Sequence, residues 1–137
     1  MGLFWWRAKS EFLAQIKGII VTEGAFSSIS IQQALNKAYG GVSRNPWRVI
    51  ACSGSGATDF QKQALKELKD KGFKVVIAPD TDEAGMKMYQ KFVDSSAATH
   101  YAFTNDTEKD WNDVLKDIGM EEFAKFVIKS ITPIDVK

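Results

Sequence analysis

Short apolar runs alternate with helix-like patterns along most of the chain. Four runs have the length and the apolar or β-branched composition of strands: residues 18–22, 47–52, 75–78 and 98–104. Helical patterns occupy residues 27–39, 59–71, 83–93, 110–118 and 121–131. Strands that alternate with helices pair in parallel through right-handed crossovers. The pattern therefore predicts an α/β fold with about four mainly parallel strands flanked by helices.

The 137 residues are enough for one domain with a core of its own. We place a covering helix at 1–17, where the adjacent Trp5 and Trp6 fit packing better than stacking on nucleic acid. Residues 18–119 hold the alternating pattern. The stretch 120–137 adds a helix and the tail around Pro133, which is expected to be frayed. In the helix at 83–93, the expected core residues are Met86, Met88 and Tyr89.

The charge balance leaves the partner open. The net charge of +1 neither indicates nor excludes a polyanion, because a basic patch can lie within a balanced total. The single cysteine, Cys52, excludes an internal disulfide and a cysteine-based metal cluster, and it fits a reduced, cytoplasmic setting. No apolar stretch approaches the roughly 20 residues that span a bilayer. The first residues do not resemble a signal peptide, so we expect no membrane partner.

The candidate chemistry begins with two carboxylates after the third apolar run. Asp80 and Asp82 follow Pro79 at the carboxyl end of a buried strand, where open α/β sheets bind ligands. Two carboxylates so close are costly unless a cation lies between them or one takes a proton, and oxygen ligands alone favour Mg²⁺ or Mn²⁺. The alternative is structural, with Asp80 as a turn residue and Asp82 as a helix N-cap. The spacing leaves both interpretations open.

Other acidic residues follow other predicted strands. Glu23 and Gly24 come directly after the first strand, and the glycine allows a sharp turn or the close approach of a ligand. Asp110 follows the fourth strand after a polar loop. If the strands are neighbours, these acids and the Asp80/Asp82 pair converge at one edge of the sheet. An acid beside a paired-acid metal site is suited to phosphoryl transfer.

A Gly/Ser loop at 53–58 leads from the second strand into a helix. Such a loop offers backbone N–H groups to a phosphate, but an ordinary turn with a capping Thr58 or Asp59 explains it as well. It lacks the lysine of a Walker A loop. Basic residues that could contact a nucleic-acid backbone, or simply form a solvated surface, are Arg44, Arg48, Lys62, Lys66 and Lys69.

Taken in order, these stretches resemble the signature of the Toprim domain, which topoisomerases, bacterial-type primases and related nucleases share. The family carries Glu-Gly after its first strand and Asp-x-Asp after its third, here VTEGAF with Glu23 and APDTDEAG with Asp80 and Asp82. The trailing Glu-Ala-Gly, the SGSGAT loop and KDWNDVL at 109–115 are similar to elements of primases and of Toprim proteins of plasmids and conjugative elements. The resemblance covers about residues 18–118.

The resemblance implies a compact, Rossmann-like Toprim fold and a function. The implied function is phosphoryl or nucleotidyl transfer on nucleic acid by a Mg²⁺-dependent domain, with Mn²⁺ as the alternative ion. The domain would belong to a primase-like replication protein of a mobile element. It implies single-stranded DNA template and nucleotides as partners, and other domains or subunits of a replication protein. By position Glu23 is the general acid/base or a neighbour of the metal, and the main metal ligands are Asp80 and Asp82. Asp110 would help to hold a second metal ion or the phosphates of the incoming nucleotide. Nucleic-acid or phosphate contacts are assigned to Gly24, Ser53, Gly54, Thr58, Lys62 and Lys109.

Two positions depart from the primase-type pattern. Ser27 stands where many members have Asp, four residues after the first-strand Glu, and Asn112 stands where some have another acid. Both changes remove carboxylates from the edge and weaken the case for two metal ions. The alternative function is a non-catalytic module that keeps the fold to bind nucleic acid or a replication partner. His100, the single histidine, lies within a predicted strand and is assigned no role.

Overall fold

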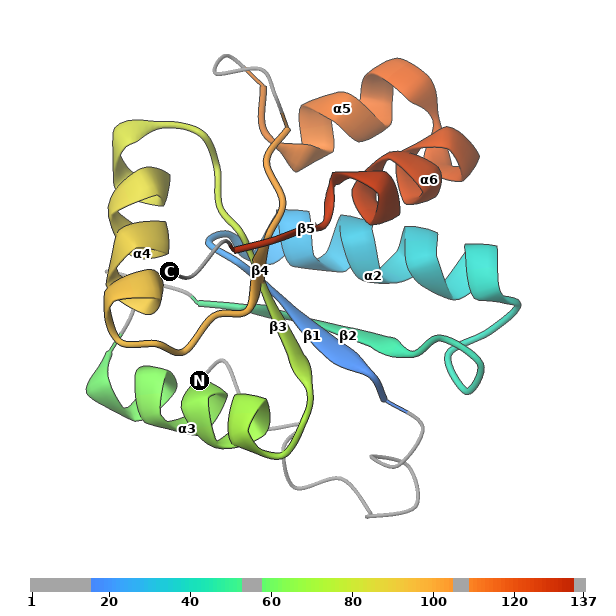
Figure 1. Ribbon diagram of the computed structural model, residues 1–137. Helices are drawn as coiled ribbons and strands as arrows, with labels where there is room; N and C mark the ends of the chain where they lie inside the picture. Colours follow the sequence, from blue (N-terminus) through green and yellow to red (C-terminus); the bar gives the residue numbers. More distant parts are fainter. Residues whose placement is uncertain (1–15, 53–57, 105–108, 135–137) are drawn as a thin grey trace.

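The computed structural model describes residues 16–52, 58–104 and 109–134 (Figure 1). The helix predicted for 1–17 lies almost wholly outside the described residues, as do Ser53 and Gly54. The elements in chain order are β1 (Gly18–Thr22), α2 (Ala25–Tyr39), β2 (Trp47–Ala51), α3 (Asp59–Asp70), β3 (Lys74–Ala78), α4 (Glu83–Asp94), β4 (His100–Tyr101), α5 (Trp111–Ile118), α6 (Met120–Ser130) and β5 (Thr132–Pro133).

The strands form one sheet in the order β2-β1-β3-β4-β5. β1 pairs in parallel with both neighbours over its full length, so that Thr22 lies level with Ala51 of β2 and Ala78 of β3. β4 also runs parallel to β3. The predicted α/β fold with a mainly parallel sheet is confirmed. Because β1, β2 and β3 end level, the residues that follow them meet at one edge.

The sheet has a fifth strand where the sequence predicts a frayed tail. Thr132 and Pro133 pair antiparallel with β4, which places Thr132 opposite Tyr101. The Ile134 N–H extends this pairing by donating to the Thr99 carbonyl at 3.0 Å. β4 is shorter than the predicted 98–104, since only His100–Tyr101 has strand geometry. The expectation of a frayed tail is therefore wrong as far as Ile134, because pairing with β4 holds this part in place, and the last three residues lie outside the described part of the chain.

Helices cover both faces of the sheet (Figure 1). On one face, α3 and α4 bury a core that includes Leu65 and Phe92. On the other face, α2, α5 and α6 bury a core that includes Leu35, Trp111 and Phe123. Ile19 and Val21 of β1 contribute to one core and Ile20 to the other, which is why the middle of this strand is continuously apolar. None of the described helices has the length and apolar character needed to cross a membrane.

The sequence-based expectation for α4 is partly wrong. Met88 is buried with 2% of its surface exposed, and Tyr89 is half-buried against the same core. Met86, predicted to be a core residue, is 38% exposed. Each helical residue turns about 100° from the one before it, so residues two apart point in nearly opposite directions and cannot both face the sheet.

Candidate metal centre

The topology creates a natural binding position between β1 and β3. From β1 the chain passes through α2 to β2 on one side, whereas β3 lies on the other side of β1. The helices that follow β1 and β2 consequently cover opposite faces of the sheet. Ligands of open α/β sheets bind where the winding changes direction in this way, at the carboxyl ends of the strands. Glu23 directly follows β1, and Asp80 follows β3 by two residues.

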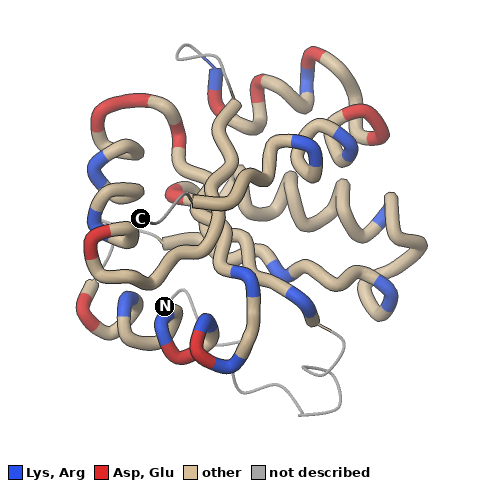
Figure 2. The backbone as a smooth tube through the Cα atoms, in the orientation of Figure 1, with Lys and Arg blue, Asp and Glu red and all other residues tan. Residues whose placement is uncertain are grey.

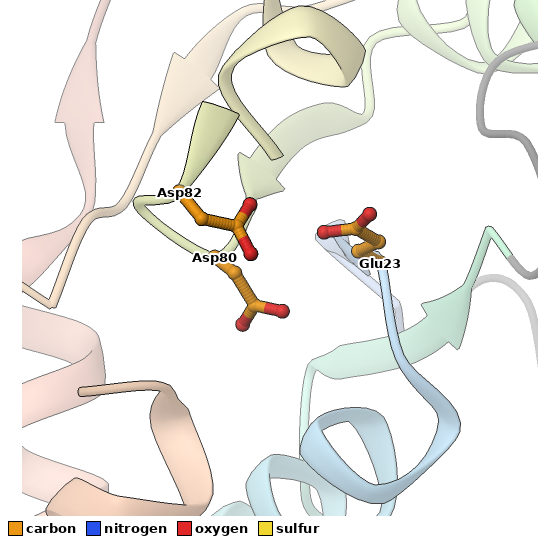
Figure 3. Close-up of side chains that lie close together, drawn as sticks. All are labelled: Glu23, Asp80 and Asp82. Carbon is orange, nitrogen blue, oxygen red and sulfur yellow. The ribbon is translucent and has the colours of Figure 1, made fainter. Parts of the chain in front are cut away.

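Three carboxylates meet at this position. Glu23, Asp80 and Asp82 each offer one oxygen, and these oxygens all lie within 4.8 Å of one another. Figure 3 shows the three side chains facing a common space from the ends of β1 and β3. Oxygens that share one cation at about 2.0–2.6 Å are separated by at most about 5 Å. The cluster therefore has the donor type and the spacing to hold one hard divalent cation.

Glu23 gives independent support for a cation. Its Oε1 atom is buried and has no hydrogen-bond partner among the described residues. An unpaired buried polar atom costs free energy, and more so when it carries charge. Burial, followed by the charges of Asp80 and Asp82, raises the pKa of Glu23 above its ordinary value. A cation in the cluster would satisfy the unpaired oxygen and offset the repulsion.

Asp80 carries the same electrostatic signature. Burial raises the pKa of its carboxyl, and the charges of Asp110, Asp82 and Asp113 raise it further. These three neighbouring charges are all negative, and the shift of the Asp80 pKa runs against ionisation. The folded chain thus holds Asp80 in a site that disfavours its charged form, and a bound cation would offset this effect.

Asp82 caps a helix and also lies in the acidic cluster. Its Oδ1 accepts a hydrogen bond from the Gly85 N–H at 2.7 Å and caps the N-terminus of α4. The structural interpretation is therefore correct for Asp82. The same side chain also belongs to the acidic cluster. The cap fixes the orientation of the carboxylate, and a negative charge at a helix N-terminus is favourable.

Gly85 shapes the loop that presents Asp80, a role that the sequence pattern did not assign. A Cβ atom at Gly85 would overlap the backbone carbonyl oxygen of Asp80 and lie 2.8 Å from its carbonyl carbon. The backbone of the first turn of α4 therefore packs directly on that of Asp80, which only glycine permits. The one sequence signal was the Glu-Ala-Gly that ends the Asp-x-Asp motif.

Trp111 ties α5 to the end of β3. Its side chain is fully buried, and its indole N–H donates to the Ala78 carbonyl at 3.2 Å. Ala78 is the last residue of β3, two residues before Asp80. The indole ring also packs edge-on against Phe123 of α6. The tryptophan of the KDWNDVL stretch thus supports the strand end that carries the cluster.

Replacing Trp111 with phenylalanine is expected to lower the free energy of unfolding by about 1–3 kcal/mol, because the Ala78 carbonyl loses a buried partner. Urea unfolding measures the change. Trp47→Phe is the matched control, because Trp47 lies in the same core and has no side-chain hydrogen bond within the described part of the chain. An equal loss in both variants would contradict the role given to the indole N–H.

Asp110 and Asn112 lie beside the cluster in different roles. Asp110 caps α5, where its side chain accepts a hydrogen bond from the Asp113 N–H at 2.8 Å. Asp110 is not one of the three clustered residues, but its charge raises the pKa of Asp80. Asn112 accepts a hydrogen bond from Ser30 Oγ and so joins α5 to α2. Ser27 is buried in the first turn of α2. Of the two positions that depart from the primase-type pattern, Asn112 thus bonds to another helix and Ser27 lies inside the fold.

The residues predicted to contact phosphate are spread around this edge. Thr58 Oγ1 accepts a hydrogen bond from the Gln61 N–H at 3.1 Å in the capping box of α3. Lys62 forms an ion pair with Asp59, with 3.7 Å between Nζ and Oδ1. Gly24 has an extended backbone (φ −99°) that any residue can adopt, so it makes no sharp turn of the kind reserved for glycine. Lys109 forms an ion pair with Asp117.

Acidic and basic residues gather at opposite ends of the strands. In Figure 2 acidic positions gather around the β3–α4 connection and α5, whereas basic positions follow the amino-terminal ends of β1, β2 and β3. Arg48 of β2 is buried, and its guanidinium donates to the carbonyls of Asn45, Trp47 and Val42. Arg48 is therefore engaged with the protein's own backbone, away from the acidic cluster.

Cys52 lies near the cluster but is not activated. Burial, with the charge of Glu23, raises the pKa of its thiol to about 11, and Sγ donates to Gln61 Oε1 at 3.0 Å. The thiolate is the nucleophilic form of cysteine, and this environment disfavours it. The chemistry of the site therefore belongs to the carboxylates.

The fold and the cluster define a small α/β domain with a candidate oxygen-donor cation site at its switch point. A family model described as Toprim-like matches residues 20–115, so the chain belongs to the Toprim-like family. A solved structure, a small TOPRIM domain protein from Bacillus stearothermophilus, is 16% identical. It has a TM-score of 0.53, with 87% of this chain and 93% of the other covered, which shows that the fold is shared. No curated protein matches the sequence.

Family membership agrees with the geometry. The Toprim fold expected from the sequence is confirmed by the family match and the structural likeness. A Toprim domain with a Glu/Asp/Asp cluster is a metal-binding, nucleic-acid-related module. The edge that holds the cluster is therefore the candidate site for both the cation and the nucleic acid.

Proposed function

We propose that the chain is a Mg²⁺-dependent catalytic module that transfers phosphoryl or nucleotidyl groups on nucleic acid, as part of a primase-like replication protein of a mobile element in the cytoplasm. The observation that carries this proposal is the cluster of Glu23, Asp80 and Asp82, with oxygens within 4.8 Å and a buried, unpaired Oε1 on Glu23. The ordered motifs of the primase type, which end in KDWNDVL, support the choice of reaction class.

The three carboxylates take different parts in this proposal. Asp80 and Asp82 would hold the ion, which when bound neutralises phosphate charge and orients phosphate oxygens. Glu23 moves the proton of the attacking hydroxyl, a task favoured by the raised pKa of its carboxyl. Asp110, whose charge already acts on Asp80, would support an ion or the ion-bound phosphates of a nucleotide.

Around the cluster, residues on the edge would contact the substrate strand. Gly24 leaves open space beside its Cα, since no atom lies within 4 Å of a Cβ built there, and a phosphate could approach its backbone. Thr58 and Lys62 begin α3 on the same edge, and Lys109 precedes α5. The substrates in this proposal are single-stranded template and nucleotides, which other domains or subunits would help to position.

The proposal is tested by template-dependent nucleotide incorporation with the purified chain in Mg²⁺ and in Mn²⁺. Wild type is expected to extend or synthesise a primer. Asp80→Asn is expected to lose about a hundredfold in rate, since losing even a residue that orients a metal ligand costs up to about a hundredfold. A folded wild-type protein that binds the ion but transfers no nucleotide would overturn the catalytic proposal.

A second candidate is a non-catalytic module that binds nucleic acid or a replication partner. It is favoured by Asn112, whose hydrogen bond to Ser30 commits it to helix packing, and by Ser27, which is buried. This candidate predicts single-stranded DNA binding that persists in Asp80→Asn and without divalent ions. Metal-dependent turnover by the wild-type protein would exclude it.

A further inference from the structure

The structure contains a pocket that is separate from the acidic cluster. It lies at the side of the sheet where β4 and β5 are the last two strands, and it has a volume of about 390 Å³. It is lined by Tyr101, Phe103, Phe126, Lys129, Ser130 and Thr132. Pockets for small ligands commonly measure about 300–1,000 Å³, so this one has room for a ligand near the lower limit. We refer to these six residues as the aromatic pocket.

One wall of the aromatic pocket is a fixed pair of rings. Tyr101 and Phe103 are two residues apart on an extended chain and so project to the same side. Their ring centroids are 4.8 Å apart, at an interplanar angle of 32°. Tyr89 of α4 packs edge-on against both rings, with centroids at 6.1 Å and 5.3 Å. Both pocket rings are half-buried, so each is held from behind and keeps an accessible surface.

The α6 part of the pocket lining combines a third ring with a positive charge. Phe126 is half-buried and packs on the core residue Trp111, with ring centroids 6.0 Å apart. Lys129 is exposed and lies three residues later on α6, in its last turn. No acidic side chain within the described ranges forms a salt bridge with Lys129. The pocket therefore presents aromatic faces beside an ammonium group whose charge is not neutralised by an ion pair there.

We propose that the aromatic pocket binds a base of single-stranded nucleic acid, with Lys129 on a neighbouring phosphate. This inference rests on the proposed function and extends it, since it supplies a place for the strand beside the metal centre. Aromatic rings that stack on bases, together with basic side chains that follow the backbone, are how proteins bind single strands. Bases in a duplex are already stacked and paired, so the pocket should prefer a single strand.

The aromatic pocket is close enough to the cluster for one short strand to reach both. Tyr101 pairs with Ile77 of β3, and the Ala102 N–H continues the ladder by donating to the Ile77 carbonyl at 3.0 Å. Asp80 follows Ile77 by three residues, which span at most about 11 Å of extended chain. A strand whose phosphate lies at the cluster can therefore place a nearby base over Tyr101 and Phe103.

Fluorescence anisotropy with a labelled single strand of about 12 nucleotides, and with its duplex, tests the inference. Phe103→Leu keeps an apolar side chain but removes the stacking face, and should weaken single-strand affinity about tenfold. Lys129→Gln should reduce the slope of log affinity against log salt by about 0.7. Lys125→Gln is the matched control, because Lys125 lies on the same helix and pairs with Glu122 outside the aromatic pocket. It should change neither quantity.

A second readout uses the unaltered protein, so that it does not depend on the folding of a variant. Photocrosslinking to a strand that carries 5-bromouracil should modify Tyr101, Phe103 or α6, which line the aromatic pocket. Adducts confined to other segments, or unchanged binding by Phe103→Leu and Lys129→Gln, would overturn the aromatic pocket and leave the proposed function standing. Failure of the wild-type protein to bind any nucleic acid would instead overturn the proposed function itself.

Discussion

Replacing Asp80 with asparagine is expected to abolish Mn²⁺ binding and, at neutral pH, to stabilise the metal-free protein. The variant removes one of the three clustered carboxylates, and with it a charge that raises the pKa of Glu23. At about one hundred times its Kd, a bound ion stabilises the folded state by about 2.7 kcal/mol, and this gain should vanish in the variant. Calorimetric titration with Mn²⁺ and urea unfolding with and without the ion measure the two effects.

The pH dependence of stability has a definite sign. Burial and three neighbouring carboxylates raise the pKa of Asp80 above its ordinary value of 3.8. The folded protein therefore binds this proton more tightly than the unfolded chain. The resulting stability is fully present below pH 3.8 and is lost as the pH rises through the raised pKa. The metal-free wild type should lose stability across that window, and Asp80→Asn should lose less.

Asp70→Asn serves as the control for the change of charge. Asp70 ends α3, is exposed, and takes no part in the cluster. The substitution should change stability by no more than about 0.5 kcal/mol and leave Mn²⁺ binding intact. Two results would contradict the account of the metal centre: Asp80→Asn that binds Mn²⁺ like wild type, or Asp80→Asn that is less stable than the metal-free wild type at neutral pH.

The sequence predicts the parts of this fold that depend on regular patterns. Buried parallel strands read as continuous apolar runs, which is why 18–22 and 75–78 could be recognised and the meeting of Glu23 with Asp80 expected. β5 escaped prediction because two residues, one of them Pro133, carry no periodicity. That pairing depends on β4, more than 30 residues earlier in the chain, whose edge would otherwise be exposed.

The candidate site also has a part that the sequence predicts and a part that it does not. Residue type and position beside a strand end were enough to select Glu23, Asp80 and Asp82. The sequence could not show that the Trp111 indole bonds to the last residue of β3, 33 positions away, or that Asn112 bonds to Ser30 across 82 positions. Such contacts depend on how helices cross the sheet, which no local pattern records.

Gly85→Ala should have the largest effect on the metal centre of any substitution that leaves every carboxylate in place. The added methyl group would overlap the Asp80 carbonyl oxygen, and neither atom belongs to a flexible side chain that can move aside. Relief requires α4 to shift or the Asp80 backbone to turn, at a cost of roughly 3 kcal/mol. Either movement displaces Asp80 from Glu23, so the affinity for Mn²⁺ should also fall. We expect a decrease of about tenfold or more, which corresponds to at least ~1.4 kcal/mol of binding free energy.

Gly24→Ala separates this steric effect from the general cost of losing a glycine at the site. Gly24 also adjoins the cluster, yet no atom lies within 4 Å of a Cβ built there, and its φ of −99° suits alanine. The free energy of unfolding of Gly24→Ala should differ from that of wild type by less than about 1 kcal/mol, which is the scale of a helix N-cap substitution. The variant should still bind Mn²⁺. If Gly85→Ala behaves like Gly24→Ala in urea unfolding and Mn²⁺ titration, the backbone contact of α4 does not position Asp80. A selective loss in Gly85→Ala would show that the helix after the Asp-x-Asp motif holds the metal ligands in place.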